Sequence, residues 1–418
     1  MSRFSFLHAA DLHLDTPFEG LGAAHPQVAA ALRDASLQAW DRLVQEAVRR
    51  RVAFVLLAGD LYDGPERGLR AQLRFRRGLH RLAEAGVEVF VVHGNHDPLE
   101  EGWSALRDLP PGVHVFGPGD PEAVPVVRGG RRIALVHGVS YATRAERANL
   151  ARRFVRAPGE GLQIGLLHAH VEGQAGHDPY APCSLDDLRA SGLHYWALGH
   201  VHLRQTLSSG ATWAVYPGNL QGRSPKATEC GAKGAVLVHA AGDAVEHVEF
   251  VPLAPVRFES VRVDIEGLPD LAALEGALLG AVQAFGDAEG VVVRARVVGR
   301  GPLHADLIRA GDGFLELLRE ASPGGSPWIH WDRIDQETAP PVDRAALLAR
   351  DDFAGALLRR VDALRSDPEA LAALVARADT ELVRGALARV VPPADASACE
   401  ELLRGAEALA LDRFGGAA

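Results

Sequence analysis

Cysteine is scarce in this chain of 418 residues, and its placement excludes two kinds of protein. The three cysteines, Cys183, Cys230 and Cys399, are scattered and form no Cys-x-x-Cys pair. This spacing excludes a disulfide-stapled scaffold and a zinc site built from thiolates, and it suits a reducing compartment. A chain of this length buries a large core without such staples. We therefore expect a cytoplasmic protein.

Long hydrophobic runs are also missing. No apolar stretch approaches the ~18 residues that a membrane-spanning helix needs, so we expect no membrane association. Met1-Ser-Arg3 leads straight into a predicted strand, which argues against a signal peptide. Internal repeats and low-complexity tracts are absent as well. With 47% apolar and 23% charged residues, the composition is that of a soluble globular protein.

Lysine is almost absent, and the negative charge is unevenly distributed. Up to Pro255 the chain has 26 Lys and Arg against 27 Asp and Glu, whereas from Val256 onward it has 18 against 27. The net charge of −10 therefore lies mainly in the C-terminal part. The net charge of the whole chain argues against nucleic-acid binding that relies on bulk positive charge, but the part up to Pro255 is nearly neutral before any metal is counted. The acidic C-terminal region fits a protein partner better than DNA.

The pattern of apolar residues predicts an α/β fold. Strand-like runs at residues 3–10, 52–58 and 87–92 alternate with helical patterns over 26–51 and 66–85. Later strands are closely spaced with glycine turns, which favours antiparallel additions. Together these runs predict a core of two sheets packed face to face with helices outside (αββα).

Prolines mark two boundaries, at Val251-Pro-Leu-Ala-Pro255 and at Ala339-Pro-Pro341. We expect a first α/β domain over residues 1–255, a small α/β accessory domain over 256–340 and a helical C-terminal region over 341–418. Single helices are expected over 303–318 in the accessory domain, and over 344–364 and 368–390 in the C-terminal region.

Five short polar motifs follow predicted strands. They are Asp11-Leu-His13, Gly59-Asp60-Leu-Tyr-Asp63, Gly94-Asn95-His96-Asp97, His168 and Gly199-His200-Val-His202. Ligands bind at the carboxyl ends of strands in open α/β sheets, so we expect these side chains to meet there. Seven of them, Asp11, His13, Asp60, Asn95, His168, His200 and His202, supply oxygen and nitrogen ligands and no sulfur. Such a set suits Mn²⁺-like ions better than a closed tetrahedral zinc site.

Two cations a few ångströms apart need a shared anion, and Asp60 is the best candidate for it. The flanking Gly59 lets the backbone approach closely. A two-metal centre lowers the pKa of a bound water and clamps the attacking and leaving oxygens of an in-line displacement. The motifs therefore predict phosphoester hydrolysis.

His96 lies beside the ligand Asn95 in an extended turn. It can protonate the leaving alkoxide or stabilise the pentavalent phosphorane. We expect Asp97 to orient His96 as a hydrogen-bond acceptor, and Asp63 to hold a neighbouring ligand or water. His170 competes with His168 for the ligand position, but His168 directly ends its strand and is the better candidate.

The complete set of motifs resembles the calcineurin-like metallophosphoesterase superfamily. Within it, Phe6-Leu-His-Ala-Ala-Asp-Leu-His-Leu-Asp15 is similar to the SbcD/YhaO-type DNA repair exonucleases. The run Tyr216-Pro-Gly-Asn-Leu-Gln-Gly-Arg223, followed by Gly231-Ala-Lys-Gly234, is similar to them too. The resemblance covers about residues 3–255 closely and the remainder only in layout.

This resemblance implies a ligand set. One metal would be held by Asp11, His13, Asp60 and His202. The other would be held by Asp60, Asn95, His168 and His200, and His96 would be the catalytic residue. Some relatives carry His where Asp63 stands, where it helps exonuclease action, so the balance of exonuclease to endonuclease activity stays open.

The resemblance also implies a role and partners. It implies Mn²⁺-dependent exonuclease action on DNA, with endonuclease action on single strands, in DNA repair. Relatives typically form homodimers and pair with an SMC-like (SbcC-type) ATPase. Arg223, Lys226 and Lys233 are candidate DNA contacts in the loop after Tyr216, with a plain surface loop as the alternative.

Two other functions fit parts of the sequence. The same dinuclear site serves phosphatases and cyclic-nucleotide phosphodiesterases. The SbcD-like loop and the additional domains favour the nuclease, because a small-molecule phosphatase would not need them. A DNA-end-binding or partner-binding module with a decayed site ranks below both, since all seven ligands and His96 are present.

Overall fold

The chain is described by a computed structural model covering residues 3–16, 26–64, 68–100, 109–172, 180–286, 288–322, 325–382 and 396–414. It forms two compact units. The first comprises residues 1–261, 280–295 and 318–333, and the second comprises 262–279, 296–317 and 334–418. The domain boundaries expected at Pro255 and Pro341 stay predictions.

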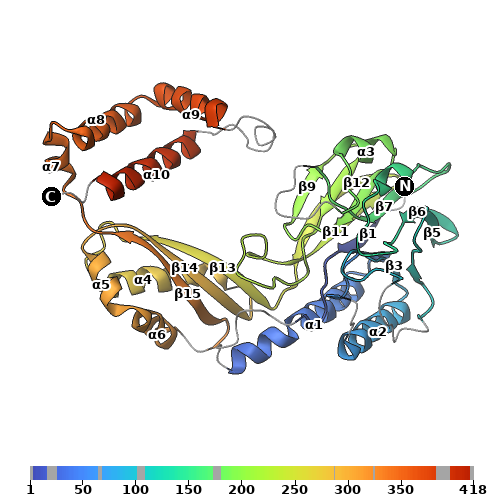
Figure 1. Ribbon diagram of the computed structural model, residues 1–418. Helices are drawn as coiled ribbons and strands as arrows, with labels where there is room; N and C mark the ends of the chain where they lie inside the picture. Colours follow the sequence, from blue (N-terminus) through green and yellow to red (C-terminus); the bar gives the residue numbers. More distant parts are fainter. Residues whose placement is uncertain are drawn as a thin grey trace. The chain divides into compact units, whose positions relative to one another are not determined.

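Two six-stranded sheets form the framework of the first unit (Figure 1). One has the order β12 (Ala244–Pro252), β11 (Gly234–Ala241), β1 (Arg3–Ala9), β2 (Phe54–Ala58), β3 (Glu88–Val92) and β4 (Val113–Val115). The other has the order β5 (Glu122–Arg128), β6 (Arg131–Gly138), β7 (Leu162–His168), β8 (Tyr195–Gly199), β10 (Trp213–Tyr216) and β9 (Gln205–Ser208).

Strand direction explains why the polar motifs converge. In the first sheet β1 to β4 run parallel, and in the second β6, β7, β8 and β10 run parallel. The carboxyl ends of β1, β2 and β3 therefore meet at one edge of their sheet, and those of β7 and β8 do the same in the other. The antiparallel strands β11 and β12 extend the first sheet, as expected. For β6, β7, β8 and β10 the expected antiparallel arrangement is wrong, because these later strands run parallel to one another.

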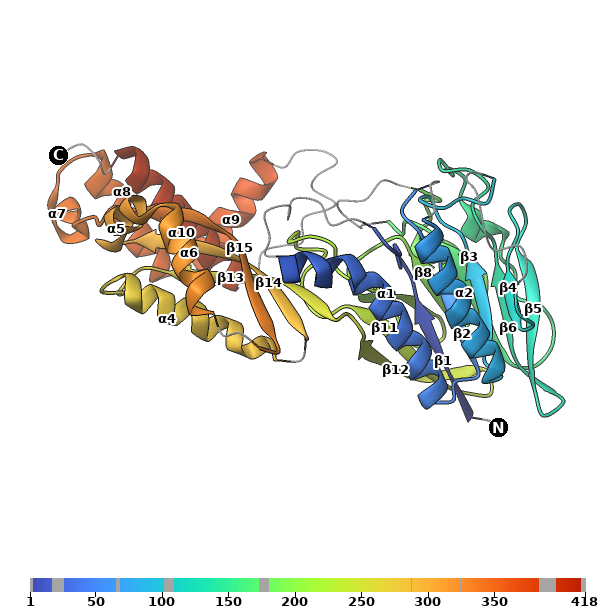
Figure 2. The same cartoon turned by 90° about the horizontal axis from the view of Figure 1, so that it is seen from below.

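Apolar side chains of the two sheets pack against each other. The cluster between them includes Phe6, Phe54 and Phe90 from one sheet with Ile164 and Tyr195 from the other. The opposite face of the first sheet is covered by α1 (Pro26–Arg49) and α2 (Leu69–Glu84), which lie side by side (Figure 2). The outer face of the second sheet carries η1 (Leu150–Arg153) and α3 (Leu185–Ala190). The predicted two-sheet αββα core is confirmed.

A three-stranded sheet follows, with the order β13 (Val256–Asp264), β14 (Gly290–Arg300) and β15 (Trp328–Ala339). The helices between its strands are α4 (Leu271–Val282), η2 (Gln283–Phe285), α5 (Leu303–Ala310) and α6 (Asp312–Ala321). The single helix expected over 303–318 is wrong. Gly311 has a left-handed φ of 50° and ends α5, because glycine adopts that conformation without steric cost.

The C-terminal helices are α7 (Arg344–Ala349), α8 (Phe353–Arg365), α9 (Pro368–Leu382) and α10 (Ala396–Phe414). The helix expected over 344–364 is interrupted, because Arg350 is extended and the Asp352 side chain caps the start of α8. The last part of the expected helix over 368–390 lies outside the described residues. Leucines and valines of α8, α9 and α10 pack together. No helix in the described part of the chain combines the length and apolar character of a membrane span.

Candidate metal centre

The structure brings the five polar motifs together. Asp11 and His13 follow β1, Asp60 follows β2, and Asn95 follows β3, all in the first sheet. From the second sheet His168 ends β7, and His200 and His202 follow β8. All seven residues are buried, with exposed fractions of 9% or less. A cluster of this kind, far apart in sequence and buried together, is the feature that the motifs predicted.

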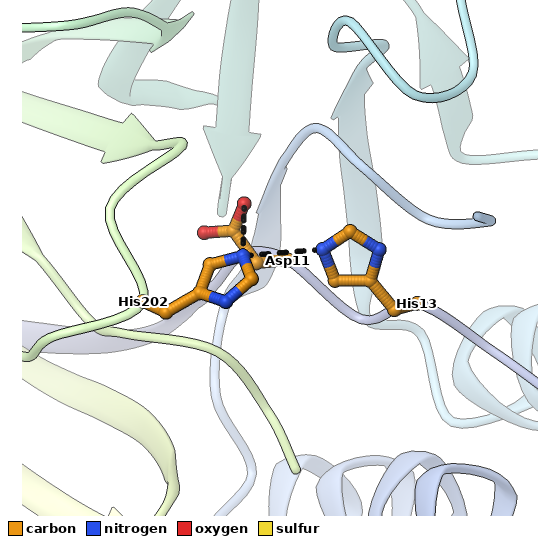
Figure 3. A group of neighbouring side chains, drawn as sticks. All are labelled: Asp11, His13 and His202. Carbon is orange, nitrogen blue, oxygen red and sulfur yellow. Dashed lines mark hydrogen bonds and ion pairs between the residues drawn. The ribbon is translucent and has the colours of Figure 1, made fainter. Parts of the chain in front are cut away.

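Asp11, His13 and His202 form the first group of facing ligand atoms (Figure 3). His13 Nε2 and His202 Nε2 lie 3.2 Å apart. His202 Nε2 lies 3.9 Å from Asp11 Oδ1, and His13 Nε2 lies 4.0 Å from Asp60 Oδ2. Two imidazole nitrogens and two carboxylates thus face one small space.

The outer nitrogens of these two histidines decide what the inner ones can do. His202 Nδ1 lies 2.6 Å from Glu229 Oε1, and His13 Nδ1 faces Asp63 Oδ1 at 3.6 Å. Each carboxylate favours the proton on Nδ1 of its imidazole, which leaves a lone pair on Nε2. The facing atoms are then all acceptors, and a cation between them would satisfy them. This donor set fits a divalent ion.

Asp60, Asn95 and His168 form a second group. His168 Nδ1 donates to the main-chain oxygen of Ala58 at 2.9 Å, so its Nε2 carries a lone pair. That nitrogen faces Asn95 Oδ1 at 3.1 Å and Asp60 Oδ2 at 3.4 Å. Again the facing atoms are acceptors. Because Asp60 Oδ2 also lies 4.0 Å from His13 Nε2 of the first group, Asp60 occupies the position of a shared anion.

His200 lies beside the second group. Its backbone N–H donates to both carboxylate oxygens of Asp11 at 3.1 Å, and its ring centroid is 5.2 Å from that of His168. The ring of His170 lies next to His200, with centroids 5.9 Å apart. The contact with the Asn95 and Asp60 oxygens is made by His168, not by His170.

Glycines make the close approach of these segments possible. Gly59 has φ +90°, and a Cβ there would lie 2.5 Å from His168 Nδ1. A Cβ at Gly94 would collide with Asp60 Oδ1. Several ligand-bearing residues are themselves in strained backbone, with φ of 51° at Asp11 and 50° at Asp60. Strain of this kind costs of order 1–3 kcal/mol per residue and is concentrated at functional sites.

The two buried carboxylates have opposite electrostatic environments. Burial, followed by the nearby charge of Asp60, raises the pKa of Asp11 well above its ordinary range. Burial acts to raise the pKa of Asp60 too, but the neighbouring imidazoles, that of His168 first, outweigh it and lower this pKa below its usual range. Two adjacent buried carboxylates repel each other when both are ionised, and bound cations would remove that penalty.

His96 is partnered by a different carboxylate from the one expected. Its Nδ1 lies 2.7 Å from Asp63 Oδ1. Asp97 instead accepts hydrogen bonds from the backbone N–H groups of Leu61 and Gly94, at 2.9 and 3.0 Å. The prediction that Asp97 orients His96 is therefore wrong, because its carboxylate is used to hold the two motif loops together.

Asp63 also affects the protonation of His96. Burial acts to lower the pKa of His96, but the hydrogen bond to Asp63 and the charge of Asp60 outweigh burial and raise this pKa. With 30% of its side chain exposed, and 28% of that of Asp63, His96 lies where it can reach a substrate. A raised pKa favours the protonated imidazole, which can donate a proton.

The three candidate DNA contacts have different surroundings. Arg223 Nη1 lies 3.1 Å from Asp63 Oδ2, and its Nε is buried without a hydrogen-bond partner among the described residues. Lys226 is exposed. Lys233 is 5% exposed, and its Nζ donates to the main-chain oxygens of His202 and Thr228. Lys233 is unavailable to DNA, so the expected contact is wrong for this residue.

Glu229 was missed by the sequence analysis. It is buried in the loop before β11, and it contacts His202, which is distant in the sequence. The run Glu-Cys-Gly-Ala-Lys-Gly carries no ligand spacing that would mark it. Asp63 was expected to support a ligand or water, and its contact with His96 was not predicted. The signal available in the sequence was its place as the second Asp of Gly-Asp-x-x-Asp.

Comparisons with known proteins identify the family of the chain. Residues 4–204 match the family model of the calcineurin-like phosphoesterases, and residues 258–339 match the middle domain of the metallophosphoesterase YhaO. The chain belongs to the calcineurin-like metallophosphoesterase family. It is 37% identical over 371 residues to the uncharacterized metallophosphoesterase YhaO of Bacillus subtilis, covering 88% of each chain.

Other relatives are DNA double-strand break repair proteins. Mre11 of Aeropyrum pernix is 30% identical over 268 residues, which cover 60% of this chain and 61% of that one. Mre11 of Haloferax volcanii is 26% identical over 416 residues, covering 90% and 85%. The family and the ligand clusters together define a phosphoesterase with a candidate site for divalent metal ions.

Proposed function

We propose that this chain hydrolyses phosphodiester bonds of DNA with two divalent cations, Mn²⁺ in the working enzyme, as an exonuclease with endonuclease action on single strands. Asp11, His13 and His202 would hold one ion and Asn95, His168 and His200 the other. Asp60 would bridge the two ions.

The observation that carries this proposal is that two sets of side chains, both in contact with Asp60, turn only hydrogen-bond acceptor atoms toward each other. In each group the outer nitrogen of a histidine is engaged, and its inner nitrogen faces other acceptors at 3.1–4.0 Å. Uncompensated groups of this kind are costly when buried. Two bound divalent ions supply a nucleophile at neutral pH and clamp the oxygens of an in-line displacement.

The side chains of the chain itself would then complete the reaction. His96 donates a proton to the departing sugar oxygen, and Asp63 fixes the ring and raises the pKa of the imidazole. Arg223, held beside Asp63, places a positive charge near the phosphate.

DNA as the substrate is supported by the relatives named for double-strand break repair and by the loop that carries Arg223 and Lys226. Arg223 would contact the phosphate at the site, and the exposed Lys226 would contact the backbone further along. Asp97 would act as a positioning residue, through the loops of Leu61 and Gly94 rather than through His96.

An SMC-like (SbcC-type) ATPase partner, a homodimer and a role in DNA repair complete the proposal. They are supported by the family resemblance and by the acidic C-terminal region, whose charge fits a protein surface better than DNA. Co-purification and light scattering of the full chain with and without such an ATPase test both associations.

The central test incubates the purified chain with end-labelled duplex and single-stranded DNA in Mn²⁺, Mg²⁺ or EDTA, beside bis-p-nitrophenyl phosphate. We expect Mn²⁺-dependent degradation that His96→Ala lowers by about 10²–10⁴-fold, the usual size of general acid catalysis, while both ions stay bound. His247→Ala, on exposed β12, is the matched control. Intact cleavage by His96→Ala would overturn the assigned role of His96. Hydrolysis of the small diester without any DNA cleavage would overturn DNA as the substrate of the chain alone.

A further inference from the structure

Glu229 is a buried acid in contact with a side chain proposed to bind metal. Its Oε1 lies 2.6 Å from His202 Nδ1. Its Oε2 accepts hydrogen bonds from Asn219 Nδ2 at 2.7 Å and from the Arg223 backbone N–H at 3.0 Å. With 6% of Glu229 exposed, both oxygens are engaged inside the protein. The carboxylate is thus fixed through Oε2, and it holds His202 through Oε1.

Lys233 also contacts His202, through the main chain of that histidine. Its Nζ donates to the His202 carbonyl oxygen at 2.7 Å and to the Thr228 carbonyl oxygen at 2.5 Å. Burying a lysine is costly unless its ammonium group is well hydrogen-bonded. Here the ammonium group joins the end of the β8 segment to the loop that carries Glu229. An apolar residue of similar length would fill the space but could not make this connection.

The loop from Gly218 to Lys233 also reaches the other sheet. The Asn219 N–H donates to the His202 carbonyl oxygen, and the Leu220 N–H donates to the Asp11 carbonyl oxygen, both at 3.3 Å. Ala10 and Asn219 form an isolated parallel β-bridge. Asp11 follows β1 of one sheet and His202 follows β8 of the other. The loop therefore joins two ligand-bearing segments that belong to different sheets.

We propose that Glu229 and Lys233 are positioning residues for the first ion of the centre: Glu229 fixes the tautomer and direction of the His202 ring, and Lys233 fixes the main chain that carries it. This inference rests on the proposed metal binding. Neither residue touches the substrate. Partners of this kind typically change metal affinity by 10–100-fold when they are altered.

The experiment measures Mn²⁺ binding to the full chain by the electron paramagnetic resonance signal of free Mn²⁺, together with the hydrolysis of bis-p-nitrophenyl phosphate. Glu229→Gln keeps an acceptor but removes the charge, and Glu229→Leu removes both. Lys233→Met keeps the length and removes the donor. Glu246→Gln and Arg131→Met, both on exposed side chains, are the controls.

We expect one of two Mn²⁺ ions to bind about 10–100-fold more weakly in Glu229→Leu, with a smaller loss in Glu229→Gln and in Lys233→Met. The Mn²⁺ concentration for half-maximal turnover should rise, while kcat at saturating Mn²⁺ changes far less. Circular dichroism of the metal-free variants checks the fold, and Glu229→Gln serves as the test if Glu229→Leu does not fold.

The outcomes separate the two proposals. If the unaltered chain does not bind two Mn²⁺ ions, the proposed metal centre itself fails. If the unaltered chain binds two ions and the folded variants bind both with the same affinity, the metal centre stands and the positioning role is overturned. Equal weakening of both ions would also overturn it, because the contacts of Glu229 and Lys233 belong to the His202 side alone.

Discussion

The two halves of the candidate metal centre hold their histidines in different ways. In the first half the outer nitrogen of His202 meets the carboxylate of Glu229, at 2.6 Å. In the second half the outer nitrogen of His168 donates to a main-chain oxygen of Ala58, at 2.9 Å. A carboxylate raises the basicity of an imidazole more than a carbonyl does. The orientation of His202 in the first half thus depends on a side chain that mutation can remove, whereas the orientation of His168 in the second half depends on the β2 backbone.

The difference also concerns how the halves are assembled. Ala58 ends β2 and is part of the parallel sheet, so the support of His168 comes with the fold itself. The support of His202 comes from a loop between β10 and β11. Removing a side chain that contacts one half should accordingly weaken metal binding in that half alone. Removing a side chain that contacts both halves should weaken both.

Asp60→Asn should have the largest effect, because Asp60 is the member common to both halves. Loss of its charge should weaken the binding of both Mn²⁺ ions and lower turnover by about 10³-fold, because bound metal ions contribute several kcal/mol of transition-state stabilisation. Isothermal titration with Mn²⁺ and diester hydrolysis measure this. Asp186→Asn, whose side chain is 90% exposed on α3, is the matched control. Retention of two tight ions would contradict the shared position of Asp60.

Asp63→Asn should have an intermediate effect, because Asp63 contacts His13 of the first half, His96 and Arg223. We expect turnover to fall by about 10–100-fold, as for other partners that orient a functional imidazole. Because Asp63 raises the pKa of His96, its loss lowers that pKa, so the alkaline limb of the pH–rate profile should move to lower pH. A profile that keeps its alkaline limb, at any level of activity, would show that Asp63 does not govern His96.

The smallest expected effect is that of His13 on the free energy of unfolding of the metal-free protein at acid pH. Burial, followed by the charge of Arg223, lowers the pKa of His13 to about 4, whereas an unfolded histidine has a pKa of 6.5. Between these values the unfolded chain binds more protons, so the free energy of unfolding falls as the pH falls. The contribution of one such group is up to ~1.4 kcal/mol per pH unit.

Urea unfolding in EDTA at several pH values between 7.5 and 4.5 measures this dependence. His13→Gln should flatten it, and the exposed His247→Gln should leave it unchanged. An identical slope in His13→Gln and in the unaltered chain would show that His13 is not buried in its neutral form.

Much of the fold was predictable because its signals are local. Apolar runs such as residues 54–58 and 89–92 indicate buried strands, and the intervening amphipathic patterns indicate helices that cover a sheet. The helix over 303–318 was predicted wrongly because a glycine inside an apolar pattern does not reveal whether it ends the helix. Gly311 ends it through a left-handed φ that only the folded backbone shows.

The seven predicted ligand residues stand out by their types, their spacing and their place after strands, and all seven are buried. That they bind metal stays a prediction. The partners of those residues were not recognisable. Glu229 lies 27 positions from His202, and Lys233 lies 31 positions from it. Asp97 was the wrong partner for His96 because adjacency in sequence suggested it, whereas the turn directs Asp97 toward Leu61 and Gly94.

The sequence by itself determined the two-sheet architecture and the chemical nature of the site, because strand periodicity and ligand identity are properties of short segments. Only the tertiary structure decided which groups support the ligands. That choice depends on how close segments from two different sheets approach, and on which carboxylates and ammonium groups are buried between them. Such distances are set by packing across the whole unit, and no short stretch of sequence encodes them.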